Sequence, residues 1–346
     1  MDALDILAIP LTAPQALFSN PHDLLRSYRT LVKEWHPDIN SHPQATEVIQ
    51  HIEVLYKIAK ERQEQGRWEE TNTLFLKGKN GKNYRVMFVA KGEDEIGQWY
   101  LGQSHMTYFI RSENQDLVEN TLGRIGKWIF SDARMQEEAE RFLPRLKTTI
   151  ELDEGIALVF EKWPEAIRLR DLLTYLGGVI DPRHAAWIIS RLYGIAYYCD
   201  YNGIVHGDFS LDTIYVIPAL HTVSFPSGWW YTHKHGEKLR ALPQRTMTHV
   251  ATQYTREQKA VDGIDRELIR LTAREMLGSV DGTTLLKRKD IPPALAEWCW
   301  RPAPPRTTVM EEWEKWRGQT LKESFGPPRF IDMPITFADV YSNHGG

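Results

Sequence analysis

The pattern of hydrophobic and polar positions divides the chain into three parts. Apolar residues recur at helical spacing through residues 1–70, which predicts an almost wholly helical segment. Residues 71–163 contain short runs of alternating apolar and polar positions, typical of strands, and one long helical insert. Long amphipathic patterns return over residues 164–346, separated by loops rich in Pro and Trp. We therefore predict an α+β protein of several domains, without internal repeats.

The first part contains two helical patterns joined by a short polar loop. Their apolar positions are Leu24, Tyr28, Leu31, Val32 and Trp35 in the first helix and Ile49, Ile52, Leu55, Tyr56 and Ala59 in the second. On the first helix, Arg26, Arg29 and Lys33 fall on the face opposite the apolar stripe. Pro37 pushes the backbone of His36 out of the helical region, so the first helix is predicted to end there. Two antiparallel helices are the simplest arrangement.

The loop between these helices contains the tripeptide His36-Pro37-Asp38. A tripeptide is weak evidence by itself, but here a helix with a cationic face runs directly into it and a second amphipathic helix follows. With this context, residues 3–68 resemble the J-domain of DnaJ-like co-chaperones. YRTLVKEWHPD is similar to the second helix and signature of that family, and IEVLYKIAKE is similar to its third helix.

This resemblance implies a partner and a function for the first part of the chain. The tripeptide would bind a DnaK-type chaperone and stimulate its ATP hydrolysis. Arg26, Arg29 and Lys33 would steer docking onto an acidic face of that partner. The rest of the chain would then bind a protein client. The alternative interpretation is a helical hairpin whose cations are only a solvated face.

The remainder of the chain contains a series of motifs in a recognisable order. A long apolar helical pattern from Pro182 to Tyr201 is followed by His206-Gly207-Asp208 and a short strand pattern, the arrangement of a protein-kinase catalytic loop. The other motifs are a glycine-containing hairpin at residues 92–100, a strand at 107–111, a helix beginning at Gln136, a strand at 156–161, Thr255-Arg256-Glu257-Gln258 in place of Ala-Pro-Glu, and a helix beginning at Asp265. Residues 72–320 thus resemble a protein kinase, which implies a bilobal fold with an N-lobe at 71–163 and a C-lobe at 164–346.

The kinase resemblance assigns catalytic and nucleotide-binding roles to single residues. Asp208 would be the catalytic base, with His206 beside it in the motif. Arg111 would replace the third-strand lysine, and Glu138 would be the glutamate that pairs with it. The positions that would contact a nucleotide are Gly92, Asp94, Gly97, Thr213 and Ser227.

Three further residues would serve the scaffold of such a domain. Asp265 would hold the backbone of the catalytic loop. Glu257 would form an ion pair with Arg306, and such a pair is costly to break once it is buried.

Several groups that phosphoryl transfer needs are replaced in this sequence. The reaction requires a lysine on the phosphates, two metal ligands and a base. Thr213 stands where the metal-binding asparagine is expected, and residues 224–229 contain no carboxylate in place of Asp-Phe-Gly. Because Mg²⁺ prefers carboxylate and phosphate oxygens, these losses remove its anchor. The resemblance therefore implies a pseudokinase without a metal or cofactor, in which Trp229 and Trp230 would plug the cleft, and ATP and Mg²⁺ would bind only in a cleft that is still competent.

Composition and charge exclude some classes of function. The chain has 42 Lys and Arg against 46 Asp and Glu, a net charge of −4, so it offers no basic footprint for nucleic acid and no polybasic membrane signal. No stretch approaches the roughly 18 apolar residues that cross a membrane. Cys199 and Cys299 are too few and too far apart for a structural zinc site or a disulfide framework. A reducing, cytoplasmic location is the expectation.

Three functions are compatible with the sequence. The first is a co-chaperone whose J-domain recruits a DnaK-type chaperone while the pseudokinase-like domain binds a client. The second is an atypical active kinase that uses Asp208 as its base and takes unusual metal ligands from Asp212 or elsewhere. The third keeps the J-domain only as a docking module without ATPase stimulation. The first is the function that we predict.

Overall fold

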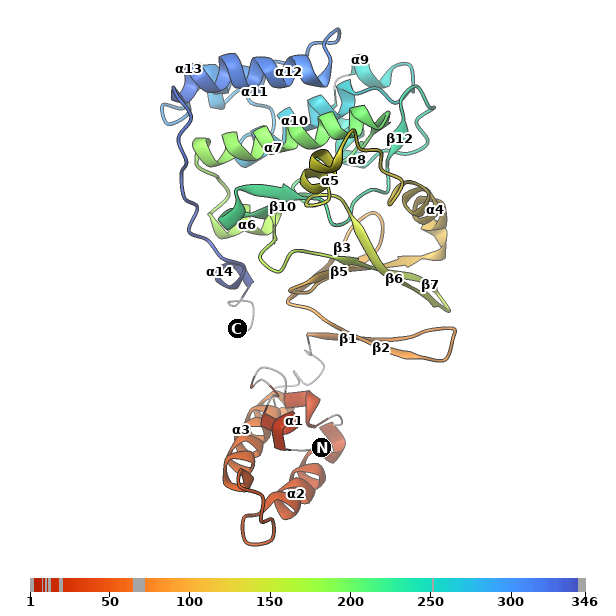
Figure 1. The fold of residues 1–346 in the computed structure, drawn as a ribbon, viewed down its shortest axis with the longest axis vertical. Coiled ribbons are helices and arrows are strands. Elements are labelled where there is room, and N and C mark those ends of the chain that lie inside the picture. Colours follow the sequence, from red (N-terminus) through yellow and green to blue (C-terminus); the bar gives the residue numbers. More distant parts are fainter. Residues whose placement is uncertain are drawn as a thin grey trace. The chain divides into compact units, whose positions relative to one another are not determined.

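The computed structural model describes residues 3–7, 9, 11, 14–18, 21–64, 72–250 and 252–341. The chain divides into two compact units (Figure 1). The smaller unit comprises Met1–Phe75 with Arg85–Met87, and the larger unit comprises Leu76–Tyr84 with Phe88–Gly346. The first boundary predicted from the sequence, at residue 70, lies outside the described residues.

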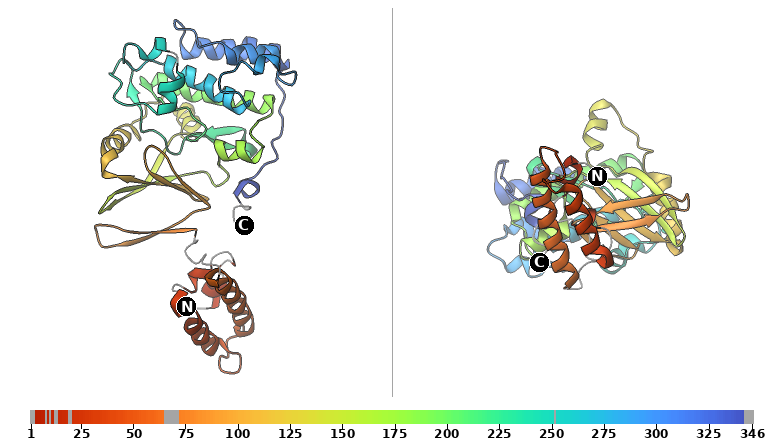
Figure 2. Two further views of the ribbon diagram at one scale, coloured as in Figure 1. Left: turned by 180° about the vertical axis from the view of Figure 1, so that it is seen from behind. Right: turned by 90° about the horizontal axis from the view of Figure 1, so that it is seen from below.

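The smaller unit is helical. Helix α1 spans Ala3–Leu7, α2 spans Leu24–Trp35 and α3 spans Ala45–Glu64, and 3₁₀ turns lie at Pro14–Ala16 and Pro21–Asp23. Helices α2 and α3 pack side by side (Figure 2). The rings of Tyr28 and Tyr56 stack between them, with 3.9 Å between centroids. The buried apolar side chains are Ala3, Ile6, Ile9, Phe18, Leu24, Trp35, Val48, Ile52, Leu55 and Ala59. The predicted pair of helices is therefore confirmed.

Helix α2 ends at the residue before His36, as predicted. His36 has φ −62° and ψ 128°, the extended conformation to which a following proline restricts a residue. The backbone N–H groups of Ile39 and Asn40 both donate to the His36 carbonyl oxygen at 2.8 Å. A tight turn therefore follows the helix and contains residues 36–38.

The strands come next along the chain. β1 (Thr73–Lys77) and β2 (Asn83–Met87) form a two-stranded sheet. A five-stranded antiparallel sheet has the order β3 (Ala90–Glu93), β4 (Gln98–Leu101), β5 (His105–Arg111), β7 (Gly155–Glu161) and β6 (Arg145–Leu152). Between β5 and β6 the chain forms two helices, α4 (Gln115–Arg124) and α5 (Ala133–Ala139).

The helical insert is thus broken in two, where the sequence pattern predicts one long helix. α4 ends at Arg124, and Gly126 follows with φ +77°, a left-handed conformation that glycine adopts without strain. α5 begins after Asp132, whose carboxylate accepts a hydrogen bond from the backbone N–H of Met135 at 2.8 Å. Apolar spacing does not reveal this break, whereas the glycine and the capping aspartate do.

The second half of the larger unit is helical. Its helices are α6 (Leu169–Tyr175), α7 (Pro182–Tyr201), α8 (Gln244–His249), α9 (Thr252–Thr255), α10 (Gly263–Met276), α11 (Pro293–Trp300), α12 (Val309–Lys315), α13 (Leu321–Phe325) and α14 (Phe337–Tyr341). Its small sheets contain β8 (Ile167–Arg168), β10 (Tyr215–Ile217) and β11 (Thr222–Ser224), and β9 (Ile204–Val205) with β12 (His233–Lys234). Helices α7 and α10 lie between the five-stranded sheet and an outer layer of α11, α12 and α13 (Figure 1 and Figure 2).

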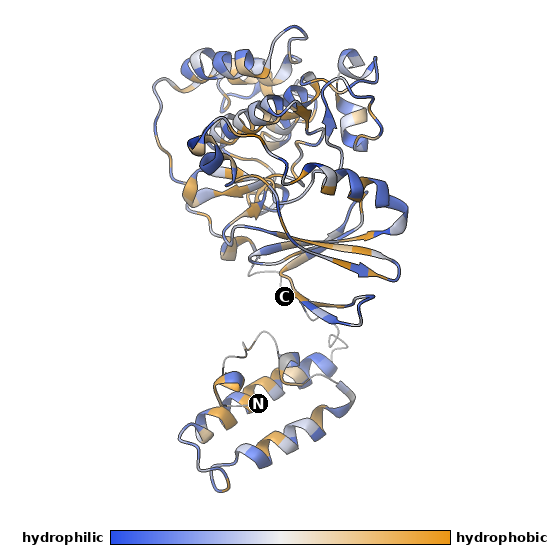
Figure 3. Ribbon diagram, turned by 45° about the vertical axis from the view of Figure 1, so that its right-hand side comes forward, coloured by the Kyte–Doolittle hydropathy of each residue, from blue (hydrophilic) through white to orange (hydrophobic). Residues whose placement is uncertain are grey.

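One hydrophobic core runs through both halves of the larger unit. It contains residues of the sheet, such as Met106 and Phe160, together with residues of the helices, such as Leu192 and Leu268. Figure 3 shows hydrophobic residues along the strands and on the inner helices. The mixed helix and sheet content confirms the predicted α+β class. The bilobal kinase fold stays a prediction at this point.

Candidate functional site

The tripeptide His36-Pro37-Asp38 lies in the turn after α2 and is open to solvent. The His36 side chain is 43% exposed and the Asp38 side chain is 85% exposed. The backbone N–H of Asp38 donates to Nδ1 of His36 at 3.2 Å, and a carboxylate oxygen of Asp38 lies 3.5 Å from the same nitrogen. A partner protein can therefore reach the carboxylate without any rearrangement of the turn.

Two residues that the sequence analysis did not assign hold this turn in place. The side-chain amide of Asn40 donates to the Glu34 carbonyl oxygen at 3.0 Å, and its Oδ1 accepts from the backbone N–H of His42 at 2.9 Å. The ring of His42 lies edge-on to Trp35, with 5.8 Å between centroids. These contacts tie the loop to α2 and preorganise the tripeptide. The signal in the sequence was an asparagine in a polar loop, where its side chain readily bonds to nearby backbone groups.

Helix α2 carries three cations beside the tripeptide. Arg26, Arg29 and Lys33 are exposed, and none of them forms an ion pair with a residue that the structure describes. Unpaired exposed cations keep their full attraction for an approaching acidic surface. The structure therefore brings together the six residues predicted for chaperone binding, on α2 and the turn after it.

The second tripeptide, His206-Gly207-Asp208, follows β9 and is hydrogen-bonded to a residue of α10. The backbone N–H groups of His206 and Gly207 donate to the two carboxylate oxygens of Asp265, at 2.7 and 2.8 Å. The Asp208 carbonyl oxygen accepts from the hydroxyl of Thr213 at 2.8 Å. Burial raises the pKa of Asp208 to about 7 and that of Asp265 to about 7. Asp265 thus lies where the kinase resemblance places it, under the backbone of this loop.

His206 is buried in a cluster of aromatic rings. It is 0% exposed, and its ring lies 4.5 Å from that of Trp229 and 5.1 to 5.2 Å from those of Phe209 and Phe225. Burial lowers the pKa of His206 to about 3, so the ring is neutral near pH 7. Its Nε2 has no hydrogen-bond partner among the described residues. The neutral imidazole therefore contributes to the packing of the loop among these rings.

The region between the sheet and this loop is filled by aromatic side chains. Trp230 is 2% exposed and contacts Tyr108 on β5 and Phe160 on β7, with centroid distances of 5.2 and 6.1 Å. Trp229 is fully buried, and its Nε1 donates to the Phe225 carbonyl oxygen at 3.0 Å. The two tryptophans are therefore buried in the core between the sheet and this loop.

The carboxylate of Asp94 accepts hydrogen bonds within the hairpin between β3 and β4 and from β5. Asp94 accepts hydrogen bonds from the backbone N–H groups of Ile96 and Gly97 at 2.9 and 3.2 Å, and from the hydroxyl of Tyr108 at 3.1 Å. Burial raises the pKa of Asp94 above its usual value. A Cβ at Gly92 would lie 2.5 Å from the Trp99 ring, so that glycine is required by packing within the hairpin. Asp94, Gly92 and Gly97 thus serve the hairpin itself.

Thr213 and Asp212, at or beside the expected metal position, are engaged by other groups of the protein. The Thr213 hydroxyl donates to the Asp208 carbonyl oxygen, and Gly228 packs so closely that a Cβ there would lie 2.6 Å from Thr213. Ser227 is 1% exposed. Asp212 is bound by the guanidinium groups of two arginines from the β8–α6 segment, which lower its pKa. Among the described residues there is no group of three or more His, Cys, Asp or Glu that could hold a metal ion.

Arg111 and Glu138 do not form the pair predicted from the sequence. Arg111 is exposed at the end of β5, and Glu138 pairs with Arg134 on the surface of α5 at 3.1 Å. Side chains alternate between the two faces of a strand, and Arg111 shares the face of Phe109, which packs on the outer side of the sheet. Tyr108 points to the inner face, into the main core. The inward positions on β5 are therefore held by Met106, Tyr108 and Ile110.

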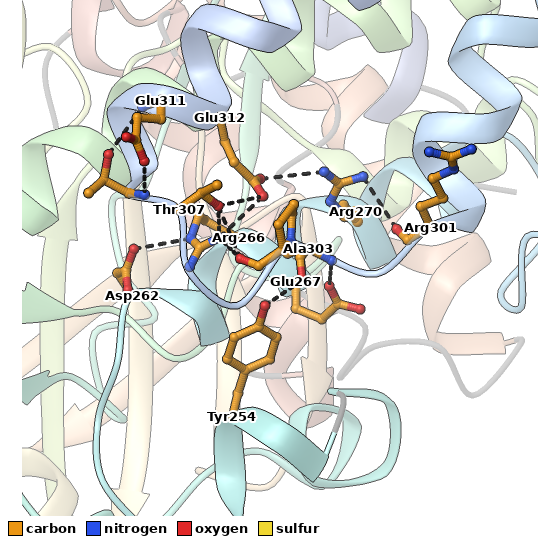
Figure 4. A network of polar contacts seen from close by, with 12 residues as sticks. Tyr254, Asp262, Arg266, Glu267, Arg270, Arg301, Ala303, Thr307, Glu311 and Glu312 are labelled. Carbon is orange, nitrogen blue, oxygen red and sulfur yellow. Dashed lines mark hydrogen bonds and ion pairs between the residues drawn. The ribbon is translucent and has the colours of Figure 1, made fainter.

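Glu257 and Arg306 do not form the predicted buried ion pair. Both side chains are exposed, and no ion pair joins these two described residues. The buried contacts of this kind join α10 to α12 (Figure 4): Arg266 lies 3.2 Å and Arg270 lies 3.5 Å from carboxylate oxygens of Glu312. α10 is buried on nearly all sides, so its arginines need carboxylates inside the protein, whereas Arg306 lies on an open loop.

Comparisons with known proteins relate part of this chain to DnaJ proteins. A chaperone protein DnaJ of Acaryochloris marina (strain MBIC 11017) is 30% identical over 83 residues, which cover 24% of this chain and 21% of that protein. DnaJ homolog subfamily C member 16 of Pongo abelii is 24% identical over 123 residues, 34% of this chain and 14% of that protein. The chain thus spans about a fifth or less of the length of these curated relatives. No protein-family model matches the chain.

These partial matches support the J-domain predicted from the sequence. They carry no support for a kinase-like domain, which stays a prediction. In the part of the chain that the structure describes, no helix is long and apolar enough to cross a bilayer.

Proposed function

We propose that the protein is a co-chaperone that recruits a DnaK-type chaperone and stimulates its ATP hydrolysis, while the larger unit binds a client protein. The observation that carries the proposal is the tripeptide in the turn after α2, where the Asp38 side chain is 85% exposed and preorganised. A fixed, accessible carboxylate can form charge-assisted hydrogen bonds with a partner at little cost in ordering. The partial similarity to DnaJ proteins supports the same assignment.

The cations of α2 supply the attraction that brings the partner to this turn. Arg26, Arg29 and Lys33 are exposed and unpaired within the described part of the chain. Complementary charge raises the rate of encounter and fixes the orientation of docking, and salt screens it. Binding to the chaperone should therefore weaken as ionic strength rises.

The larger unit acts in this proposal as an inactive kinase-like domain that binds rather than phosphorylates. Asp208 is 8% exposed, and the fully buried Trp229 packs on His206 of the same tripeptide, with 4.5 Å between ring centroids. Asp212, the alternative metal ligand, is already neutralised by arginines. Because the chaperone-binding helices and the client-binding unit are parts of one chain, a bound client experiences a raised local concentration of chaperone.

The test is the ATPase rate of purified DnaK with the full-length protein added. Asp38→Asn should lower the stimulation at least about tenfold, because losing a charge-assisted hydrogen bond costs roughly 1.5–3 kcal/mol and 1.4 kcal/mol is about a tenfold change. Glu53→Gln, an exposed carboxylate on α3, is the matched control and should stimulate as the unchanged protein does.

Two outcomes would contradict the proposal. Equal stimulation by Asp38→Asn and the unchanged protein would remove the role of the tripeptide, and no stimulation by either would leave the helices only a docking role. A rise in melting temperature with ATP and Mg²⁺, together with phosphate transfer abolished by Asp208→Ala, would instead establish the active kinase.

A further inference from the structure

A cavity of about 190 Å³ lies in the larger unit beside the segment that leads from β7 into the helical half. Three segments line it: residues 140–145 between α5 and β6, residues 161–164 after β7, and Ser224 with Pro226 at the end of β11. These segments are far apart in the sequence and meet only in the folded unit. None of the residues assigned to the tripeptides or to the nucleotide cleft lines this cavity.

The walls of the cavity are joined to one another by hydrogen bonds. The indole Nε1 of Trp163 donates to the Arg141 carbonyl oxygen at 3.0 Å, which links two of the lining segments. The backbone N–H of Phe225 donates to the Phe142 carbonyl oxygen at 2.8 Å, which links the segment of Ser224 and Pro226 to residues 140–145. The cavity is therefore preformed, so a ligand would not have to order its walls.

One buried polar group on the wall lacks a partner. Ser224 is 3% exposed, and its Oγ has no hydrogen-bond partner among the described residues. Leaving a buried hydroxyl unpaired costs free energy, so such groups usually meet a water molecule or a ligand. Ser224 lines the cavity, and rotation about its Cα–Cβ bond would turn the buried hydroxyl toward a ligand there.

The rim of the cavity carries cations with spare hydrogen-bond donors. Arg141 and Arg145 are each about half exposed, and each contacts one carboxylate, Glu137 at 2.9 Å and Glu140 at 3.3 Å respectively. A guanidinium group has five N–H donors, so both arginines can still bind a carboxylate or phosphate. The carboxylates of Glu140 and Glu161 also line the cavity, and the Lys162 amine already donates to three backbone carbonyl oxygens, so an anion would bind to the two arginines.

The remaining wall is flat and apolar. It consists of Leu143, Trp163, Pro164 and Pro226. The volume is below the roughly 300–1,000 Å³ of pockets for drug-sized ligands, which limits the occupant to about one ring with a small substituent. Rings of this kind stack on tryptophan and proline faces, while an anionic substituent would reach the arginines.

We propose that this cavity is a binding site for a small aromatic anion, with its ring on Trp163, its carboxylate or phosphate on Arg145 and Arg141, and a hydrogen bond to Ser224. The site is separate from the chaperone-binding turn. Binding there is independent of the proposed function.

The test is titration calorimetry of the full-length protein with benzoate and with phenyl phosphate, which separates a carboxylate from a phosphate source. Arg145→Gln should weaken binding about tenfold and Ser224→Ala about fivefold, because a charged hydrogen bond is stronger than a neutral one. Arg134→Gln, on α5 and outside the cavity, is the control and should bind as the unchanged protein does.

Several results would overturn the site. The first is no heat of binding with either anion, which would leave the cavity to water alone. The second is an equal affinity for neutral benzamide. The third is an unchanged affinity for the anions in the Arg145 and Ser224 variants. Each variant should still stimulate DnaK fully, so failure here and failure of the co-chaperone proposal are distinguishable. Arg145 is exposed and Ser224→Ala removes a single oxygen, so both variants should fold.

Discussion

The chain contains two His-x-Asp tripeptides with the same local geometry and opposite surroundings. At residues 36–38 and 206–208, the backbone N–H of the aspartate donates to Nδ1 of the histidine two residues earlier, at 3.2 Å in both cases. The first tripeptide lies in an open turn, with the Asp38 side chain 85% exposed. The second lies among aromatic rings, with His206 at 0% and Asp208 at 8% exposure.

The comparison shows that a local hydrogen-bond pattern does not decide what a carboxylate can do. In the open turn the carboxylate is available to another protein. In the buried loop the same group loses water, and burial raises the pKa of Asp208 to about 7. The proposed recognition role therefore belongs to the first tripeptide, and the second belongs to the scaffold of the larger unit.

The largest effect is expected from removing the rings that cover the buried tripeptide. Trp229→Ala should lower the free energy of unfolding of the larger unit by about 3–5 kcal/mol, because it removes a fully buried indole and leaves a cavity. Urea denaturation followed by circular dichroism measures this change. Trp300→Ala, with a side chain 48% exposed, is the control. A loss no greater than in that control would show that the cluster does not hold the loop.

The second largest loss of stability is expected from removing Asp265, which accepts hydrogen bonds from the buried tripeptide. Asp265→Ala removes the acceptor of two buried N–H groups, those of His206 and Gly207. An unpaired buried donor costs roughly 1–3 kcal/mol, so we expect a loss of about 2–5 kcal/mol in the same denaturation experiment. Asp153→Ala, at an exposed turn, should change little. Equal stability of both variants would contradict the role assigned to Asp265.

The third prediction concerns the pH dependence of stability. The native pKa of Asp208 is about 7 against an ordinary value of 3.8, so in this interval the native state holds a proton that the unfolded chain has released. Stability should therefore fall as pH rises, and Asp208 should contribute about 2 kcal/mol of this fall between about pH 5 and pH 7. Asp208→Asn should remove that part of the slope, while Asp153→Asn should leave it. An unchanged slope in the first variant would mean that Asp208 is ionised throughout.

The smallest effect on stability is expected at the open tripeptide. Asp38→Asn should change the free energy of unfolding of the smaller unit by no more than about 0.5 kcal/mol, because the side chain is exposed. Its melting temperature should therefore stay nearly the same. Asn40→Ala should cost about 1 kcal/mol, since it removes two hydrogen bonds of the turn. Strong destabilisation by Asp38→Asn would contradict the difference in structural role that we infer for the two tripeptides. A loss of ATPase stimulation in this variant could then result from unfolding.

Much of the local structure could be predicted. The apolar spacing of α2, α3 and α7 and the effect of Pro37 on His36 are properties of neighbouring residues, and the structure has these elements where they were expected. The residues that we propose for chaperone binding also follow from local order, because they lie on one helix and the turn after it. Asn40 was missed, although its bonds to Glu34 and His42 are local too.

The tertiary structure alone decided which distant side chains meet. Arg111 lies on the outer face of its strand, next to the inward-facing Ile110, and a shift of one residue reverses the face. A buried ion pair was expected for Glu257, but the structure has it at Glu312, because α12 brings this carboxylate to the buried arginines of α10. Spacing and turn residues determine helices and strands through short-range forces, whereas burial and ion pairing depend on segments that only the packed core brings together.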